Sequence, residues 1–234
     1  MPEETNRTIT DVLTDYYFTP SKDADSNLIN EGISKDKIFF VGNVMIDTLI
    51  KFLPKAKDSV FAFEIPQKYC LVTLHRPSNV DNEQNLKVVL SYLQNLGSRY
   101  KIIFPIHPRT RQKLSLIFLN SLTNILFIEP VGYLHFLKLQ LNASFIITDS
   151  GGIQEESTFL KVPCFTLREN TERPITISEG TNVLVGLSIN SLDLHINEFI
   201  KGKVKKGQIP NLWDGNASKR IAKIINKLLT IEEV

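Results

Sequence analysis

Short apolar runs alternate with amphipathic stretches along most of this chain. The runs are rich in Ile, Val, Leu and Phe and are apolar throughout, which is typical of parallel strands buried on both faces. The stretches between them repeat apolar residues at helical spacing; the clearest face is made by Leu86, Val89, Leu90, Leu93 and Leu96. This alternation predicts an α/β fold, a Rossmann-like parallel sheet with helices on both faces.

Capping and turn residues set the expected bounds of these elements. Strands are predicted at 17–20, 38–41, 69–74, 101–106, 125–128, 145–148, 162–167 and 183–186. Helices are predicted within 1–15, after Ser21 up to Gly32, at 44–52, after Asn82, from about 110, at 133–141, from 153, from 191 and at 217–229. Residues 54–66, 75–79 and 211–216 are expected to be linkers or loops.

One strand–turn–helix stretch is central to the chain. The apolar run 145–148 is followed by Asp149-Ser150-Gly151-Gly152, and a helical pattern begins at Ile153 with Glu155 and Glu156 in its expected first turn. A glycine turn at a helix start can direct several backbone N–H groups at one phosphate. An ordinary loop with a capped helix explains the pattern equally well, because neither GxGxxG nor a P-loop motif is present.

Further polar residues follow other strands, at the edge where parallel sheets bind ligands. His75 can donate a hydrogen bond or move a proton, and Arg76 can hold an anion. A lone loop histidine more often makes one backbone hydrogen bond, but His107 follows the neighbouring strand in the same way. With two of the four histidines at strand ends, the functional interpretation is favoured.

The remaining candidates have two interpretations each. One of Glu155 and Glu156 can face solvent while the other faces a cleft and binds ribose hydroxyls, or both can simply complement the helix dipole. An arginine of the charged loop 168–173 can grip a diphosphate, or the loop is only solvated. Phe136 or Tyr133, at the start of a predicted helix, can cover a base, or both can belong to the core.

Composition limits the classes of protein. The chain has 234 residues, 42% hydrophobic and 22% charged, which is ordinary for a globular protein. A net charge of +2 gives no support for nucleic acid or membrane-surface binding, and no apolar run reaches transmembrane length. The basic run 201–206 is expected to be a solvated loop. Cys70 and Cys164 stand in apolar surroundings, which favours buried free thiols in a cytoplasmic protein over a disulfide or metal site.

Four motifs together resemble the non-hydrolysing UDP-N-acetylglucosamine 2-epimerases. They are Thr73-Leu74-His75-Arg76-Pro77-Ser78-Asn79-Val80, Phe104-Pro105-Ile106-His107-Pro108-Arg109, Thr148-Asp149-Ser150-Gly151-Gly152-Ile153-Gln154-Glu155-Glu156 and Arg168-Glu169-Asn170-Thr171-Glu172-Arg173-Pro174. The stretch 210–221 also matches the end of that family, so the resemblance covers essentially the whole chain in one motif order.

The resemblance implies the C-terminal half of a glycosyltransferase-B-like fold, with 1–19 a remnant of the preceding domain or crossover helix and 20–234 a UDP-binding domain. It implies interconversion of UDP-GlcNAc and UDP-ManNAc by UDP elimination and re-addition, with no cofactor and no metal. The catalytic residues it implies are His75 and Glu3. The UDP-binding residues it implies are Arg76, His107, Phe136 against uracil, Ser150, Gly151 and Gly152 at phosphate, Glu156 at ribose, and Arg173 at phosphate.

Two departures from the family pattern matter. The family expects a whole domain before Pro2, which supplies further acid/base carboxylates. Ser78 stands where the family has a glutamate associated with a second, regulatory UDP-GlcNAc, so that regulation is not expected here.

The sequence therefore predicts a truncated or split epimerase that carries the UDP-binding half. We expect the isolated chain to bind UDP but not to epimerise UDP-GlcNAc. We also expect it to need a separate N-terminal-domain subunit or to form a homo-oligomer. The alternatives are a non-catalytic UDP or UDP-sugar binding module and half of a UDP-sugar glycosyltransferase.

Overall fold

The computed structural model describes residues 2–106, 108–112, 114 and 116–232, with side chains for 5–106, 108, 110–112, 114 and 118–230. The chain divides into two compact units: unit 1 comprises Met1–Thr48 and Asn211–Val234, and unit 2 comprises Leu49–Pro210. The predicted boundary after residue 19 refers to the domains of the family and stays a prediction.

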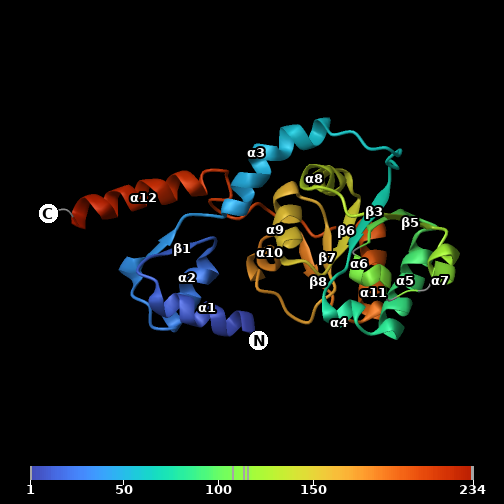
Figure 1. Cartoon of the computed structure of the whole chain (residues 1–234), viewed down its shortest axis with the longest axis horizontal. Coiled ribbons are helices and arrows are strands. Elements are labelled where there is room, and N and C mark those ends of the chain that lie inside the picture. The colour runs from blue at the N-terminus through green and yellow to red at the C-terminus, as the bar shows by residue number, and fades with distance from the viewer. Residues whose placement is uncertain (1, 107, 113, 115, 233–234) are drawn as a thin grey trace. The chain divides into compact units, whose positions relative to one another are not determined.

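Unit 2 is built on a six-stranded parallel sheet (Figure 1). Its strands are β3 (Tyr69–Thr73), β4 (Lys101–Pro105), β5 (Ile125–Ile128), β6 (Phe145–Thr148), β7 (Cys164–Thr166) and β8 (Asn182–Leu184). They lie in the order β5-β4-β3-β6-β7-β8, and every neighbouring pair is parallel. The chain winds outward in one direction from β3 and in the other from β6, which is the doubly wound Rossmann order. The predicted fold class is confirmed.

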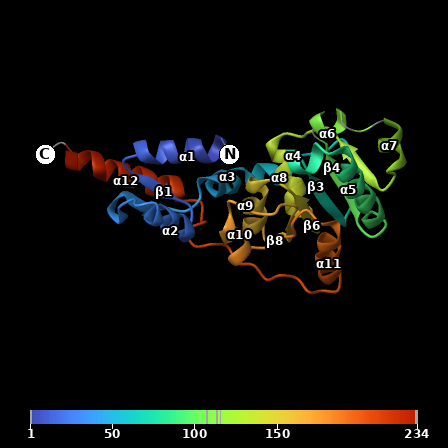
Figure 2. The same ribbon diagram turned by 90° about the horizontal axis from the view of Figure 1, so that it is seen from below.

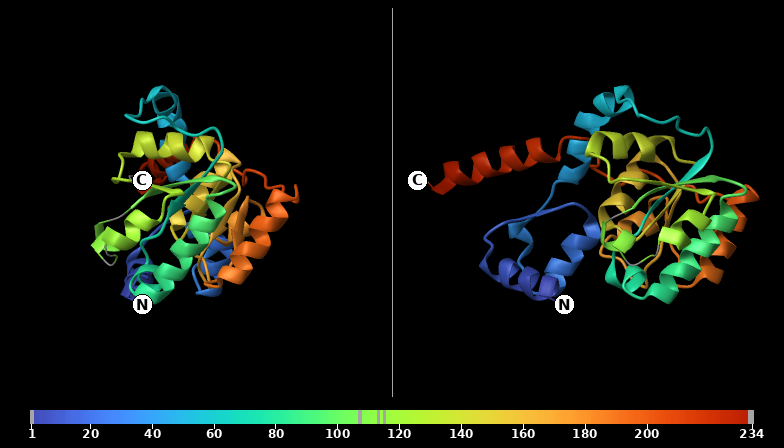
Figure 3. Two further views of the ribbon diagram at one scale, coloured as in Figure 1. Left: turned by 90° about the vertical axis from the view of Figure 1, so that its right-hand side faces the viewer. Right: turned by 45° about the vertical axis from the view of Figure 1, so that its right-hand side comes forward.

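Helices cover both faces of this sheet (Figures 1 and 3). On one face, apolar residues of α5 and α11 pack with Val72, Phe104 and Phe165 in the larger core cluster. On the other, α8 and α9 pack with Leu71 and Ile146 in a second cluster. The helix α3 (Val44–Asp58) begins in unit 1 and continues into unit 2. The other helices of unit 2 are α4 (Pro77–Val80), α5 (Glu83–Leu96), α6 (Pro108–Gln112), α7 (Leu116–Ser121), α8 (Tyr133–Asn142), α9 (Gly151–Leu160), α10 (Pro174–Ser178) and α11 (Ile189–Ile200).

Unit 1 is small and contains a two-stranded parallel sheet. Its elements are α1 (Pro2–Leu13), β1 (Tyr17–Thr19), α2 (Lys22–Asn30), the 3₁₀ turn η1 (Lys35–Lys37), β2 (Ile38–Phe40) and α12 (Ala217–Glu232), and Figure 2 shows the three helices around β1. Because parallel strands need a crossover, α2 connects β1 to β2.

Hydrogen bonds join the two chain segments of unit 1. The Asp47 carboxylate accepts the backbone N–H groups of Ala217 (3.1 Å) and Ser218 (2.7 Å), and so caps the start of α12. The Trp213 indole N–H donates to the Pro20 carbonyl oxygen at 2.9 Å. These contacts fix the C-terminal segment to the start of α3 and to the residue after β1, although 170 residues separate Asp47 from Ala217.

Several predicted elements differ from the structure. The helix predicted to open at Ser191 begins at Ile189, with Ser188 as its N-cap, and the region of the helix predicted from about 110 contains two short helices, α6 and α7. The helix that begins at Val44 continues through Pro54 to Asp58 instead of ending near Phe52, and Ala56, beyond the proline, is fully buried. Residues 77–80 form the short helix α4, which Pro77 opens, because its fixed φ suits the first helical position. The helix α10 was not predicted, and it too opens on a proline, Pro174.

The two cysteines lie on different strands and face different cores. Cys70 of β3 belongs to the larger cluster and Cys164 of β7 to the second, with β6 between their strands. Both are fully buried free thiols, as predicted. Burial raises the pKa of the Cys164 thiol to about 11 and that of Cys70 well above its usual value.

Two glycines of unit 1 offer a matched stability test. Gly42 (φ +89°) and Gly32 (φ +93°) both adopt a left-handed backbone, but only at Gly42 would a Cβ meet an atom, the Leu212 carbonyl oxygen at 2.1 Å. We expect Gly32→Ala to cost about 1–2 kcal/mol of unfolding free energy, the penalty of the left-handed conformation, and Gly42→Ala to cost clearly more. Urea unfolding followed by the fluorescence of Trp213, the single tryptophan, measures both; equal losses would contradict the close approach.

Candidate active site

The candidate site lies where the strand order of unit 2 reverses. β3 and β6 are neighbours in the sheet, and Thr73 at the end of β3 pairs with Thr148 at the end of β6. The next residues along each strand are Leu74-His75-Arg76 and Asp149-Ser150-Gly151. The fold therefore brings two of the predicted motifs to the one point of a doubly wound sheet where ligands characteristically bind.

The Asp149 carboxylate connects these two motifs. It is fully buried and accepts the backbone N–H of His75 (3.0 Å), the backbone N–H of Arg76 (2.9 Å) and the side-chain amide of Asn79 (3.0 Å). Its Oδ1 also lies 3.0 Å from Nδ1 of the His75 ring. The Arg76 Nε in turn donates to the Asp149 carbonyl oxygen at 3.1 Å. The loop after β3 is thus fixed to the end of β6 by one side chain.

These contacts shift the pKa values of both partners. Burial tends to raise the pKa of Asp149, but the hydrogen bonds from His75, Asn79 and Arg76 together outweigh it, and the pKa is lowered. The hydrogen bond to Asp149 raises the pKa of His75 against the effect of its partial burial. The pair therefore favours a charged imidazole beside a charged carboxylate.

The helix α9 begins directly after the strand, at Gly151 instead of the predicted Ile153. Ser150 occupies the N-cap position, its backbone N–H donates to the Thr148 hydroxyl at 3.0 Å, and its own side chain makes no capping hydrogen bond. A Cβ added at Gly151 or Gly152 would meet nothing within 4 Å. The first turn of α9 is consequently open to a ligand at its N–H end.

Glu155 and Glu156 are both buried, so the prediction that one of them faces solvent is wrong. Because α9 starts two residues early, they lie beyond its first turn. Glu156 accepts the Tyr133 hydroxyl at 3.0 Å and the Gln140 amide at 2.5 Å, and burial raises its pKa despite these bonds. Glu155 lies 3.0 Å from Nε of Arg173 in an ion pair.

The two arginines of the loop 168–173 have different environments. Arg168 is buried and donates through both terminal nitrogens to Glu172, at 2.7 and 2.5 Å. This bidentate pair, with Arg76 3.9 Å from the same carboxylate, lowers the pKa of Glu172 to about 2. Arg168 therefore shapes the loop, while the partly exposed Arg173 is the arginine that a ligand can reach.

The other predicted residues are less closely connected to this centre. Phe136 is partly buried and packs against the second core cluster. His107 lies outside the described residues. Glu3 belongs to α1 of unit 1, and its side chain lies outside the described part of the chain.

The residue that sequence reasoning missed is Asp149. It lies within the motif Thr148–Glu156, but the sequence pattern assigns it only to a turn. Gln140 is a further residue that the sequence does not predict, because it is buried in α8 and distant in sequence from Glu156, which it contacts. Tyr133 is a candidate only as an aromatic over a base, and its hydrogen bond to Glu156 is not predicted. The available signal for Asp149 was a carboxylate directly after a fully apolar strand, where an unpaired charge is costly.

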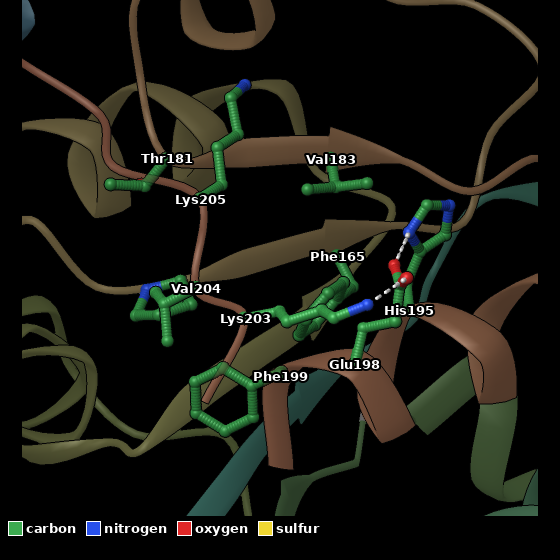
Figure 4. Close-up of a pocket in the computed structure, with 10 residues that line it drawn as sticks. Phe165, Thr181, Val183, His195, Glu198, Phe199, Lys203, Val204 and Lys205 are labelled. Carbon is green, nitrogen blue, oxygen red and sulfur yellow. Dashed lines mark ion pairs between the residues drawn. The ribbon is translucent and has the colours of Figure 1, made fainter. Parts of the chain in front are cut away.

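The described part of unit 2 contains one cavity near this centre and another away from it. One of about 370 Å³ is lined by Phe52 and by residues 132–135, next to the hydroxyl that contacts Glu156. The other, of about 350 Å³, lies between β7, β8, α11 and residues 203–205 (Figure 4). Pro163 and Thr181, which line it, immediately precede β7 and β8, so it is at the amino ends of the strands. No predicted site residue lines it.

Within the described residues, no group of three or more His, Cys, Asp or Glu side chains is placed to hold a metal ion. None of the helices in the described part of the chain has both the length and the apolar character needed to span a bilayer.

Comparison with known proteins gives one consistent family. The family model for UDP-N-acetylglucosamine 2-epimerase matches residues 1–226. The chain is 44% identical over 237 residues to a UDP-N-acetylglucosamine 2-epimerase of Methanococcus maripaludis, an alignment that covers 96% of this chain and 64% of the relative. It is 34% identical over 231 residues to the UDP-2,3-diacetamido-2,3-dideoxy-D-glucuronate 2-epimerase of Pseudomonas aeruginosa, with 97% of this chain and 64% of that protein covered.

A solved structure agrees with this match. The fold is similar to that of the UDP-GlcNAc 2-epimerase from Neisseria meningitidis bound to UDP-GlcNAc, with a TM-score of 0.85, 33% identity, and coverage of 97% of this chain and 65% of that one. The chain thus spans a little under two thirds of the length of these relatives. With nearly its entire length matched by the family model, and with the predicted resemblance confirmed, the chain belongs to the UDP-N-acetylglucosamine 2-epimerase family.

Proposed function

We propose that this chain supplies the UDP-binding part of a UDP-GlcNAc 2-epimerase. One observation carries the proposal: at the switch point of the sheet, the open first turn of α9 faces the same edge as His75 and Arg76, which Asp149 fixes in place. Such a turn binds anions through backbone N–H groups, and the two basic side chains add charge. A nucleoside diphosphate matches this combination.

Each predicted residue has a role in the proposal. Ser150, Gly151 and Gly152 bind phosphate, and Arg76, Arg173 and His107 neutralise the diphosphate. Glu156 binds the ribose: a carboxylate has about four acceptor positions, and Tyr133 and Gln140 use two of them. Phe136 covers uracil. The cavity beside Tyr133, with its aromatic lining, supports a base site at this end of α8.

The reaction in the proposal is the elimination that the family resemblance implies. A base takes the C2 proton, the electrons of the C2–H bond form a C1=C2 double bond, and the electrons of the C1–O bond leave with UDP. Re-addition of UDP at C1, with a proton delivered to the other face of C2, gives the C2 epimer. His75 and Arg76 stabilise the charge that develops on the leaving diphosphate. Glu3 is proposed as an acid/base residue near the sugar.

UDP-GlcNAc is the proposed substrate because the relatives at 44% identity carry that activity in their names. The Pseudomonas relative acts on a different UDP-sugar by its name. The residues assigned here contact UDP, which both substrates contain, so the choice between them rests on the closeness of the relatives.

A partner polypeptide is part of the proposal. Unit 1 has exposed apolar residues on α1, with Val12 77% and Leu13 79% exposed, and on α12, with Leu229 57% exposed. A hollow of about 360 Å³ lies between β1 and α12, and its lining is mixed: Phe18, Leu228 and Leu229 are apolar, while Asp15 and Lys37 are charged. Parallel sheets are normally larger and covered on both faces, so these surfaces and the two-stranded sheet of unit 1 support a docking site for a further α/β subunit or for a second copy. A cytoplasmic location stays a prediction.

The experiment is a two-step assay on the whole chain. Calorimetry with UDP tests binding, and deuterium wash-in at C2 of UDP-GlcNAc tests turnover. We expect binding without wash-in for the chain alone, and wash-in after addition of a polypeptide corresponding to the unmatched part of the Methanococcus relative. Binding with no wash-in in either case would favour the alternative, a UDP-binding module; absence of UDP binding would reject the proposal.

Gly151→Ala tests the phosphate role. The added methyl group meets no protein atom, and alanine is the better helix former by up to about 1 kcal/mol, so the thermal midpoint should stay equal or rise. UDP affinity should fall about tenfold or more, the equivalent of one hydrogen bond to a charged group, because the methyl group occupies the space of the phosphate. Unchanged calorimetric affinity would remove Gly151 from the site.

Glu156→Gln tests the ribose role. The substitution keeps the size of the side chain but removes the charge and one acceptor, and we expect UDP affinity to fall roughly tenfold. A second ligand provides the control: 2′-deoxy-UDP lacks one ribose hydroxyl, so the variant should lose less affinity for it than for UDP. Equal losses for the two ligands would show that Glu156 acts on something other than that hydroxyl.

A further inference from the structure

We propose that Asp149 is a positioning residue that sets which nitrogen of His75 faces the substrate. Oδ1 of Asp149 lies 3.0 Å from Nδ1 of the ring. A buried carboxylate can only accept hydrogen bonds, so Nδ1 must carry the proton and Nε2 is the nitrogen left for the diphosphate. The inference rests on the proposed function for the identity of the ligand, but not for the geometry of the pair.

The surroundings of the carboxylate hold it in one orientation. Oδ2 accepts three donors: the backbone N–H groups of His75 (3.0 Å) and Arg76 and the amide of Asn79. The His75 N–H is shared with Oδ1, at the longer distance of 3.2 Å. Asn79 is itself held, because the same amide nitrogen donates to the Leu167 carbonyl oxygen at 3.1 Å. Rotation of the carboxylate would only exchange two chemically equal oxygens, so the atom that faces Nδ1 of His75 is always an acceptor.

Replacement of Asp149 by asparagine should invert the proton arrangement on the ring. An asparagine has one acceptor oxygen and one donor nitrogen. If its NH₂ group faced the three donors, it would oppose all of them; the favourable choice places its oxygen there and its NH₂ group toward Nδ1. Nδ1 must then accept, and the proton of neutral His75 moves to Nε2. The replacement of one carboxylate oxygen by an NH₂ group thereby changes Nε2 of neutral His75, the nitrogen that faces the ligand, from an acceptor to a donor.

The charge of His75 depends on the same contact. The groups that face the ring are Asp149, whose hydrogen bond and charge raise its pKa, and Arg76, whose charge lowers it; Arg76 is partly neutralised by Glu172, 3.9 Å away. With Asp149 in place, the cationic ring persists to higher pH, and a cation suits a diphosphate. UDP affinity should therefore decline as the pH rises through the pKa of His75.

The experiment is nitrogen NMR on histidine-labelled full-length chain without nucleotide. The chain has four histidines, and His75→Gln identifies the signal of interest. In the wild type we expect the Nδ1–H form above the pKa, the opposite of the preference of free histidine. In Asp149→Asn we expect the Nε2–H form and a pKa lower by about one unit or more, since a neighbouring opposite charge shifts a pKa by about that amount.

A matched control is Asp47→Asn. That carboxylate also accepts two backbone N–H groups, but in unit 1 at the start of α12, and its replacement should leave the His75 tautomer and pKa unchanged. The Nε2–H form in the wild type would overturn the proposal without any variant, even if Asp149→Asn failed to fold. An unchanged tautomer in a folded Asp149→Asn chain would also overturn it.

UDP titrations across pH separate this proposal from the proposed function. We expect the two affinities to converge at low pH, where both rings are charged, and the wild type to keep its affinity to a higher pH because its ring stays cationic longer. Above the pKa of the wild-type ring, Asp149→Asn should bind UDP the more tightly of the two, because its neutral ring still carries a proton on Nε2. A wild type that binds no UDP at any pH would reject the proposed function, while the tautomer measurement would still decide the role of Asp149. Identical pH profiles alongside an inverted tautomer would overturn the link between this pair and the diphosphate.

Discussion

The site of this protein depends on one buried negative charge. A carboxylate removed from water is costly unless several donors stabilise it, and Asp149 meets that requirement with donors from the loop after β3 and from α4. The same contacts determine where His75 and Arg76 lie. Because the acceptor directly follows β6 and the donors follow β3, the ligand site exists only when these two strands pair in their correct register.

The polar groups around this centre form a second layer of constraint. Gln154 of α9 is fully buried and accepts the Thr171 hydroxyl and the Asn182 amide through one oxygen. This network fixes the charged loop that contains Arg173 to α9 and to β8. Neutral hydrogen bonds therefore hold the backbone that carries this basic side chain. Buried networks of this kind are sensitive to any single unsatisfied member.

Much of the fold follows from the sequence because the core is so strongly patterned. Fully apolar strands such as 145–148 and a one-sided helix such as 83–96 leave few alternatives, and Asn82 caps that helix as expected, accepting the backbone N–H of Asn85 at 3.0 Å. Local pattern failed where tertiary contacts decide. Glu155 and Glu156 read as surface residues of a first turn, but their partners Arg173, Tyr133 and Gln140 come from other elements, and only those partners make burial tolerable. The importance of Asp149 was likewise not evident from its neighbours in the chain.

The placement of the two cysteines has a practical consequence. The nucleophile in thiol chemistry is the thiolate, and both thiols are sealed inside the core on opposite faces of the sheet, with their pKa values raised. The native chain is therefore inert to maleimides and mild oxidants while it is folded. A single cysteine introduced on α1 or α12 would carry a fluorophore or spin label at that position alone, and burst labelling of Cys70 and Cys164 would serve as a built-in report of unfolding.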